Sequence, residues 1–260
     1  MPTDTILLEY DGPIAIISNN RPDKHNAAND EMDDGLWEIL SELEGNKDVR
    51  AVIWRANGKS WSSGRDVGQI GIRTEDIDKL SFIERGQGNF KRLFRMQAPT
   101  LCALKGRVIG GSFERALCCD IRIAAEGTRF MLPEVVHGVI TDTGGMARLF
   151  QMCGHGLTMD MILTGRVMDA EEALRHGVIS RLVPADELES TAREMAEKIA
   201  SAPAFTVKMA RRNMGLLGDE MVLRSIDEEA TTQTLTFASD DYAEMKAARV
   251  EERKPSYRGR

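Results

Sequence analysis

The strongest constraint on the fold is an alternation of short β-rich runs with one amphipathic segment near the N-terminus. The run IAIISNN, residues 14–20, precedes the polar stretch NNRPDKHN, and VRAVIWRANG, residues 49–58, forms the next apolar run. Between them, residues 29–48 carry apolar side chains at helical spacing: Met32, Leu36, Ile39, Leu40 and Leu43. A strand, a helix and a strand in this order predict an α/β fold with crossover connections.

The middle of the chain continues this alternation. The Ser- and Gly-rich residues 59–71 predict a loop, and apolar residues at intervals over 74–98 predict a helix. Residues 99–111 predict one strand that bends at two glycines into a short helix carrying Glu114. Residues 119–135 predict two short strands around a Glu-Gly turn.

The pattern changes to helices after residue 142. Three short helices are predicted over 144–154, 156–165 and 169–180, followed by a brief strand and a longer helix before Pro203. Beyond Pro203, two helical stretches are expected, residues 204–215 and roughly 219–252.

The C-terminal helical stretches carry many apolar side chains but have few partners within their own segment. They are therefore expected to pack on the main domain or on another subunit. We predict an α/β core with the active site over residues 1–200 and a helical oligomerisation region over residues 201–260.

Composition narrows the class of protein. No apolar run reaches the length of a membrane span, and no signal peptide is visible, so a cytoplasmic location is expected. The net charge of −7 argues against general nucleic-acid binding. The four cysteines and four histidines show no metal-ligand spacing, so we expect reduced cysteines and no metal.

Three stretches could carry chemistry: SSGRDV, IGGSFER and LPEVVHGVITDTGG. A strand that runs through two glycines into a helix directs unpaired backbone N–H groups, such as that of Gly111, at a ligand. Such a junction can stabilise negative charge on oxygen, and the amide of Arg65 could supply a second donor. The Glu114 carboxylate falls near the same junction.

Two glutamates over one site suit general acid–base catalysis, so Glu114 and Glu134 are candidate catalytic residues. Each also has a plainer interpretation, because Glu114 could cap its own helix and Glu134 could be a solvated turn residue. Asp142 precedes Gly144 and could cap the helix that starts there.

Taken together and in order, these stretches resemble the crotonase family, also called the enoyl-CoA hydratase/isomerase superfamily. The resemblance runs from NNRPDKHNA through VIWRANGKSWSSGRDV, VIGGSFERALCCDIRIAAEGTRFMLPEV, GVITDTGG and LTGRVMDAEEALRHGVISRLVP to ASDD and EERKPSYRGR. It implies a spiral of ββα units followed by a C-terminal helical trimerisation region. It also implies a homotrimer or a dimer of trimers. The net charge of −7 and the lack of a membrane-length apolar run predict no nucleic-acid or membrane partner.

The resemblance implies an acyl-CoA thioester substrate, with coenzyme A as part of the substrate and no separate cofactor. The thioester oxygen would bind the amides of Arg65 and Gly111. Glu114 and Glu134 would stand where the two hydratase glutamates belong. The residues expected to contact coenzyme A are Lys24, His25, Asp66 and Val67.

Several residues depart from the family pattern. Ser112 and Phe113 are expected to reshape the pocket, and the Arg65 side chain could reach the CoA phosphates or form a solvated salt bridge. At the C-terminus, Glu252 replaces a lysine expected to meet the nucleotide phosphate. Asp142 resembles the catalytic aspartate of dienoyl-CoA isomerases.

The sequence thus predicts a 2-enoyl-CoA hydratase that adds water across the C2=C3 bond. A double-bond isomerase that uses Asp142 and a non-catalytic CoA-binding protein remain the alternatives.

Overall fold

The computed structural model describes residues 3–66, 68 and 78–259, and its main sheet has six strands in the order β1-β2-β3-β4-β6-β9. The strands are β1 (Ile6–Asp11), β2 (Ile14–Asn19), β3 (Ala51–Ala56), β4 (Thr100–Leu104), β6 (Ile121–Ala125) and β9 (Arg181–Val183). Only the pairing of β1 with β2 is antiparallel. The crossover α/β fold expected from the first two apolar runs is confirmed.

A smaller sheet is built from three short strands, two of which directly follow a strand of the main sheet. It contains β5 (Arg107–Ile109), β7 (Arg129–Met131) and β8 (Met168–Asp169), in the order β5-β7-β8. The chain passes from the large sheet to the small one twice, from β4 to β5 and from β6 to β7. Both steps run in the same direction, because β5 and β7 are parallel. This repeated step places the ends of β5 and β7 side by side, where the site forms.

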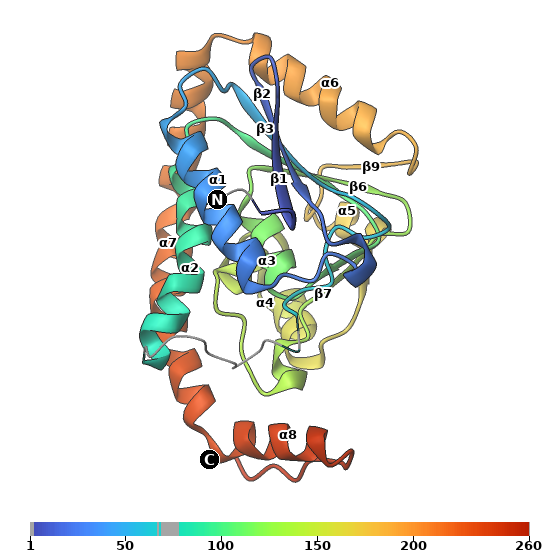
Figure 1. The fold of residues 1–260 in the computed structure, drawn as a ribbon, viewed down its shortest axis with the longest axis vertical. Coiled ribbons are helices and arrows are strands. Elements are labelled where there is room, and N and C mark those ends of the chain that lie inside the picture. The colour runs from blue at the N-terminus through green and yellow to red at the C-terminus, as the bar shows by residue number, and fades with distance from the viewer. Residues whose placement is uncertain (1–2, 67, 69–77, 260) are drawn as a thin grey trace.

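Helices cover both faces of the main sheet (Figure 1). They are α1 (Asp30–Gly45), α2 (Lys79–Arg95), α3 (Gly111–Cys118), α4 (Gly145–Thr164), α5 (Ala170–Arg175), α6 (Leu188–Ser201), α7 (Ala204–Ala238) and α8 (Asp240–Val250). One face packs Trp54 and Cys102 against α1, α2 and α3, and the other packs Ile53 and Leu101 against α6. Burial on both faces explains why these strands read as continuous apolar runs.

One predicted strand differs from the structure. The single strand expected over 99–111 is two strands, β4 and β5, separated at Gly106. Gly106 has φ +61°, and a Cβ there would lie 2.2 Å from the Lys59 carbonyl oxygen, so only glycine fits this turn. The break predicted between the helices over 144–154 and 156–165 is confirmed, because α4 kinks at Gly154, which has non-helical backbone angles.

The C-terminal region is more continuous than predicted. The two stretches expected over 204–215 and 219–252 are the 35-residue helix α7 and the short helix α8. α7 packs along α2 and α4, and Figure 1 shows α8 at the far end of the molecule. Leu216, Leu217 and Leu235 on α7 are exposed. The boundary at residue 200 and the oligomerisation role of this region stay predictions.

Within the described residues, no helix combines the length and apolarity that a membrane-spanning segment needs.

Candidate active site

The site begins where the loop after β3 runs beside β5. Ser62 pairs with Val108 in parallel, so the Ser62 amide donates to the Arg107 carbonyl oxygen (2.9 Å) and the Ile109 amide donates to the Ser62 oxygen (3.2 Å). Gly64 follows with φ +94°, and a Cβ there would lie 3.0 Å from the Ile109 carbonyl oxygen. Only glycine lets the loop approach β5 this closely.

The two candidate oxyanion amides belong to Arg65 of this loop and to Gly111 at the start of α3. Arg65 pairs with Ala28 through hydrogen bonds from the Ala28 amide to the Gly64 oxygen and from the Asp66 amide to the Ala28 oxygen, each 2.8 Å. Neither bond uses the Arg65 N–H. Gly111 is the first residue of α3, where an amide has no intrahelical partner. Neither candidate oxyanion donor, the N–H of Arg65 or that of Gly111, is therefore used in these backbone hydrogen bonds.

Glu114 lies in the first turn of α3 but does not cap that helix. It is 1% exposed, and its Oε2 accepts hydrogen bonds from the amides of Thr143 (3.2 Å) and Gly145 (2.9 Å) at the start of α4. The Gly144 amide between them donates to Glu229 Oε2 on α7 (2.8 Å). Carboxylates from two helices therefore hold three successive amides, and the interpretation of Glu114 as a cap of its own helix is wrong.

Glu134 begins the 3-10 helix η3 (Glu134–His137), which follows β7. Its Oε1 lies beside Gly110, where a Cβ would be only 3.0 Å away, and its Oε2 is buried without a hydrogen-bond partner among the described residues. Burial raises the pKa of Glu134 to about 7. The interpretation of Glu134 as a solvated turn residue is therefore wrong.

Asp142 lies in the loop before α4 and does not cap that helix, whose N-cap residue is Gly144 without a side-chain cap. Burial, with the Glu229 charge as a second cause, raises the pKa of Asp142 to about 7. Burial also raises the pKa of Glu114 well above its usual range, and the charges of Glu134, Asp142 and Glu229 add to the effect. Four acidic groups thus share one weakly solvated region, which favours protonation of some of them near neutral pH.

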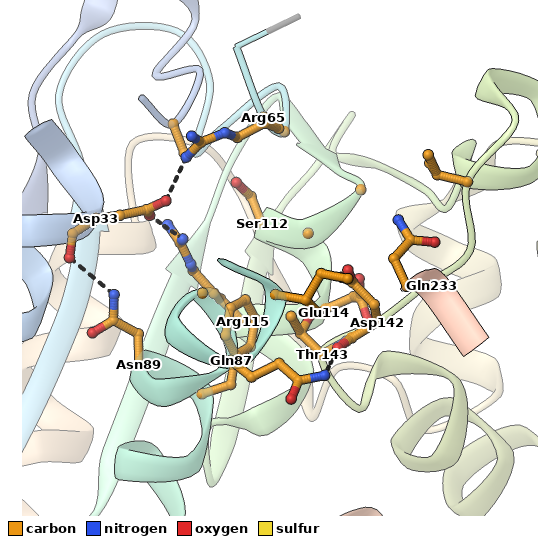
Figure 2. Close-up of a pocket in the computed structure, with 18 of the residues that line it drawn as sticks. Asp33, Arg65, Gln87, Asn89, Ser112, Glu114, Arg115, Asp142, Thr143 and Gln233 are labelled. Carbon is orange, nitrogen blue, oxygen red and sulfur yellow. Dashed lines mark hydrogen bonds and ion pairs between the residues drawn. The ribbon is translucent and has the colours of Figure 1, made fainter. Parts of the chain in front are cut away.

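A cavity of about 690 Å³ joins these groups. Its wall includes Gly64, Arg65 and Gly111 together with Glu114, Glu134 and Asp142. Figure 2 shows Glu114 and Asp142 together on one side of the pocket, with Arg65 and Asp33 across from them. The structure therefore brings together the predicted catalytic and oxyanion-hole residues around a single hollow.

The Arg65 side chain turns along the cavity wall and forms a salt bridge. Its Nη1 lies 2.5 Å from Asp33 Oδ2, and its Nη2 pairs with Asp30. Arg115 of α3 pairs with the second oxygen of Asp33 (Figure 2). The salt-bridge alternative for Arg65 is thus the one that the structure shows.

Ser112 and Phe113, which depart from the family pattern and were expected to reshape the pocket, lie in different environments. Ser112 lines the cavity and its Oγ lies 2.7 Å from Ser62 Oγ. Phe113 is fully buried against Phe130, with ring centroids 5.1 Å apart, and does not line the cavity. The expectation that Phe113 reshapes the pocket is wrong, because its position on α3 points it into the core.

The residues expected to contact coenzyme A lie at the edge of the molecule around the 3-10 helix η1 (Pro22–Lys24). Lys24 is exposed, His25 Nδ1 lies 3.1 Å from Ser60 Oγ, and Asp66 pairs with Arg21 at 3.2 Å. None of these three side chains lines the cavity. Val67 lies outside the described residues, and Glu252 is an exposed residue after α8.

Three polar residues near the site were not predicted: Gln87 on α2 and Glu229 and Gln233 on α7. Gln87 donates to the Asp142 and Ile226 carbonyl oxygens, each at 2.7 Å. Gln233 Oε1 accepts from the Ile140 amide (3.0 Å). The sequence held one signal that could have revealed them. Each is a polar residue at a position where the helical spacing of apolar side chains predicts burial.

The raised pKa of Asp142 predicts a pH-dependent stability. The pKa is about 7 in the folded protein and near 3.8 otherwise, so the folded state holds the extra proton between these values and stability falls as pH rises through them. We expect Asp142→Asn to raise the free energy of unfolding by roughly 2–4 kcal/mol at pH 8 and by much less at pH 4.5. Urea unfolding at both pH values measures this difference.

The exposed Asp186 provides the control, because Asp186→Asn changes the charge without removing a buried one. An equal effect of Asp142→Asn at both pH values would contradict the burial of a charge at this position.

A hollow that holds buried carboxyl groups beside open backbone amides defines an enzyme-type site that can move protons next to a charged oxygen. The model of the family described as enoyl-CoA hydratase/isomerase matches residues 9–260. The chain belongs to the enoyl-CoA hydratase/isomerase family, and the fold predicted from the resemblance is confirmed.

Named relatives match over the full length. The chain is 33% identical to a probable enoyl-CoA hydratase of Mycobacterium bovis, over 99% of both chains. It is also 33% identical to a short-chain-enoyl-CoA hydratase of Clostridium acetobutylicum, over 98% of this chain and 97% of the relative. A crystal structure of an enoyl-CoA hydratase/isomerase from Pseudoalteromonas atlantica superposes with a TM-score of 0.89 at 25% identity, covering 98% of this chain and all of that one.

Proposed function

We propose that this protein is a 2-enoyl-CoA hydratase, a lyase that adds water across the C2=C3 bond of an acyl-CoA thioester. The observation that carries the proposal is the pair Glu114 and Glu134, which line one cavity next to the amides of Arg65 and Gly111. Full-length relatives that bear hydratase names support it.

In this mechanism the thioester oxygen accepts hydrogen bonds from the Arg65 and Gly111 amides. These donors stabilise the enolate that forms when water adds to C3, and one such donor contributes about 10²–10³ in rate. The N-terminus of α3 adds a favourable dipole, because Gly111 is its first residue.

Glu114 and Glu134 activate the water and deliver a proton to C2. The reaction needs one carboxylate to accept a proton from water and one carboxyl group to donate, so the pair must share protons at working pH. Burial raises both pKa values, that of Glu134 to about 7, which supports this mixed protonation. The atoms balance, since the water oxygen and one hydrogen go to C3 and one proton goes to C2.

Coenzyme A would bind at the rim of the cavity near Lys24, His25, Asp66 and Val67, as the family resemblance implies. A separate cofactor or metal is not required by this chemistry. The homotrimer or dimer of trimers and the cytoplasmic location remain predictions of the sequence.

The location of Asp142 keeps double-bond isomerisation as the second candidate. Asp142 lines the same cavity and could move a proton between carbons without adding water. A non-catalytic CoA-binding protein is the third hypothesis. Such a protein would have no chemical need for a cavity lined by buried acids.

Crotonyl-CoA in H₂¹⁸O tests the proposal. We expect 3-hydroxybutyryl-CoA that carries the label at C3, detected by mass spectrometry. A parallel incubation of 3-enoyl- and 3,5-dienoyl-CoA in D₂O detects isomerisation, and rearrangement without hydration would favour the Asp142 mechanism. Absence of turnover on all these thioesters would favour the non-catalytic alternative.

A further inference from the structure

The α7 wall of the cavity presents one polar side chain that the hydratase mechanism does not use. Gln233 is 3% exposed and lies on the buried face of α7, in register with the apolar Ile226 and Ala230. It lines the cavity together with Phe237, one helical turn further along. An amide at such a position needs hydrogen-bond partners, because an unpaired buried polar group is costly.

The orientation of the Gln233 amide is set by the backbone. The Ile140 N–H can only donate, so the Gln233 atom that it meets at 3.0 Å must be the oxygen. The nitrogen then points away from the Ile140 amide, on a side chain that borders the cavity. Among the described residues, no acceptor for this nitrogen is found. Gln233 Nε2 is therefore a fixed donor open to the cavity.

Several neighbouring donors are already occupied. Gln87 Nε2 donates to two backbone carbonyl oxygens, so it has no free hydrogen for a ligand. The guanidinium groups of Arg65 and Arg115 both pair with Asp33. Gln233 Nε2 and the buried Thr143 hydroxyl are two donors on the cavity wall that keep a free hydrogen for a substrate.

The charge of the cavity wall restricts which kind of substrate group can accept a hydrogen bond from Gln233. Glu114, Glu134 and Asp142 line the cavity, Glu229 is adjacent, and the arginines across the pocket are neutralised by aspartates. Within the described part of the chain, each arginine of the cavity wall is paired with an aspartate, so a substrate carboxylate would meet repulsion there, whereas a neutral carbonyl oxygen would not.

We propose that Gln233 is a specificity residue that binds a neutral carbonyl oxygen in the acyl chain, beyond the reacting C2 and C3 atoms. The substrate class is therefore an oxo-enoyl-CoA or a related thioester with an uncharged acceptor, instead of a plain alkyl enoyl-CoA. This inference rests on the proposed function, because it assumes that an acyl-CoA occupies the cavity.

Binding of saturated acyl-CoA pairs tests the inference without turnover. Each pair compares an oxo group at C5, C6 or C7 with a methyl branch at the same carbon, and calorimetry measures the dissociation constants. For one oxo position we expect binding about tenfold tighter than for its methyl partner, the effect of one well-placed hydrogen bond in a buried site.

Gln233→Met is the decisive variant, because its side chain has nearly the same length but cannot donate a hydrogen bond at any pH. It should abolish the oxo preference. Gln151→Met makes the same chemical change on the exposed surface of α4 and should keep the preference.

Two results would overturn the inference: no oxo compound binds better than its methyl partner, or the preference persists in Gln233→Met. Crotonyl-CoA hydration in the wild-type protein is scored separately. Hydration without an oxo preference would remove only the role of Gln233, whereas an oxo preference without any hydration would remove only the proposed reaction.

Discussion

Glu114→Gln and Glu134→Gln should each lower kcat for hydration of crotonyl-CoA by about 10²–10⁴-fold, the usual contribution of a general acid or base. Glutamine has nearly the same shape as glutamate but cannot take up or release the proton that the reaction moves. In Glu114→Gln, the amide oxygen can still accept from Thr143 and Gly145, so the start of α4 keeps its partners. Steady-state kinetics and circular dichroism together separate lost chemistry from lost folding.

Glu229→Gln is the matched control for these two variants. Glu229 is a buried glutamate in the same acidic cluster, but its side chain does not line the cavity. The replacement keeps an acceptor for the Gly144 amide, so activity should fall far less than in either catalytic variant. If Glu114→Gln or Glu134→Gln retained full activity, the proposed acid–base pair would be excluded.

Gly145→Ala should lower kcat/KM by about 10²-fold, although the new residue adds only one methyl group. A Cβ at Gly145 would lie 2.4 Å from Glu114 Cγ and 2.7 Å from Glu114 Oε2, so the carboxylate has to move. A displacement of about 1 Å at a catalytic group can cost 10²-fold in rate. Kinetics with crotonyl-CoA measure this loss, and a crystal structure of the variant would show a shifted Glu114.

Gly156→Ala provides the comparison within the same helix. A Cβ at Gly156 meets no atom within 4 Å, and alanine favours a helix over glycine by about 1 kcal/mol. We therefore expect unchanged kinetics and slightly higher thermal stability. Equal kinetics for Gly145→Ala and Gly156→Ala would show that the contact with Glu114 has no catalytic role.

Glu114 and Glu229 also show how the site is tied to the helical C-terminal region. Glu114 holds the amides of Thr143 and Gly145, and Glu229 holds the Gly144 amide between them, so α3, α4 and α7 meet at three consecutive residues. The long helix α7 therefore supports the loop that carries Asp142. Its Gln233 reaches the cavity as well, which makes α7 part of the active-site wall.

The sequence alone was sufficient for features that depend on near neighbours along the chain. Alternating apolar runs placed the strands and α1, and the two glycines before Ser112 placed Glu114 in the first turn of a helix next to a free amide. These predictions hold because the spacing of side chains along a strand or a helix is set by the covalent geometry of the backbone.

Only the tertiary structure decided which distant groups meet. It turned Arg65 toward Asp33, placed Phe113 in the core, and brought Glu229 to Gly144, 85 residues away. It also placed Asp142 in the shared cavity instead of at a helix cap. Such contacts follow from the packing of whole helices and from the cost of burying unpaired polar groups, and neither is encoded in a short stretch of sequence.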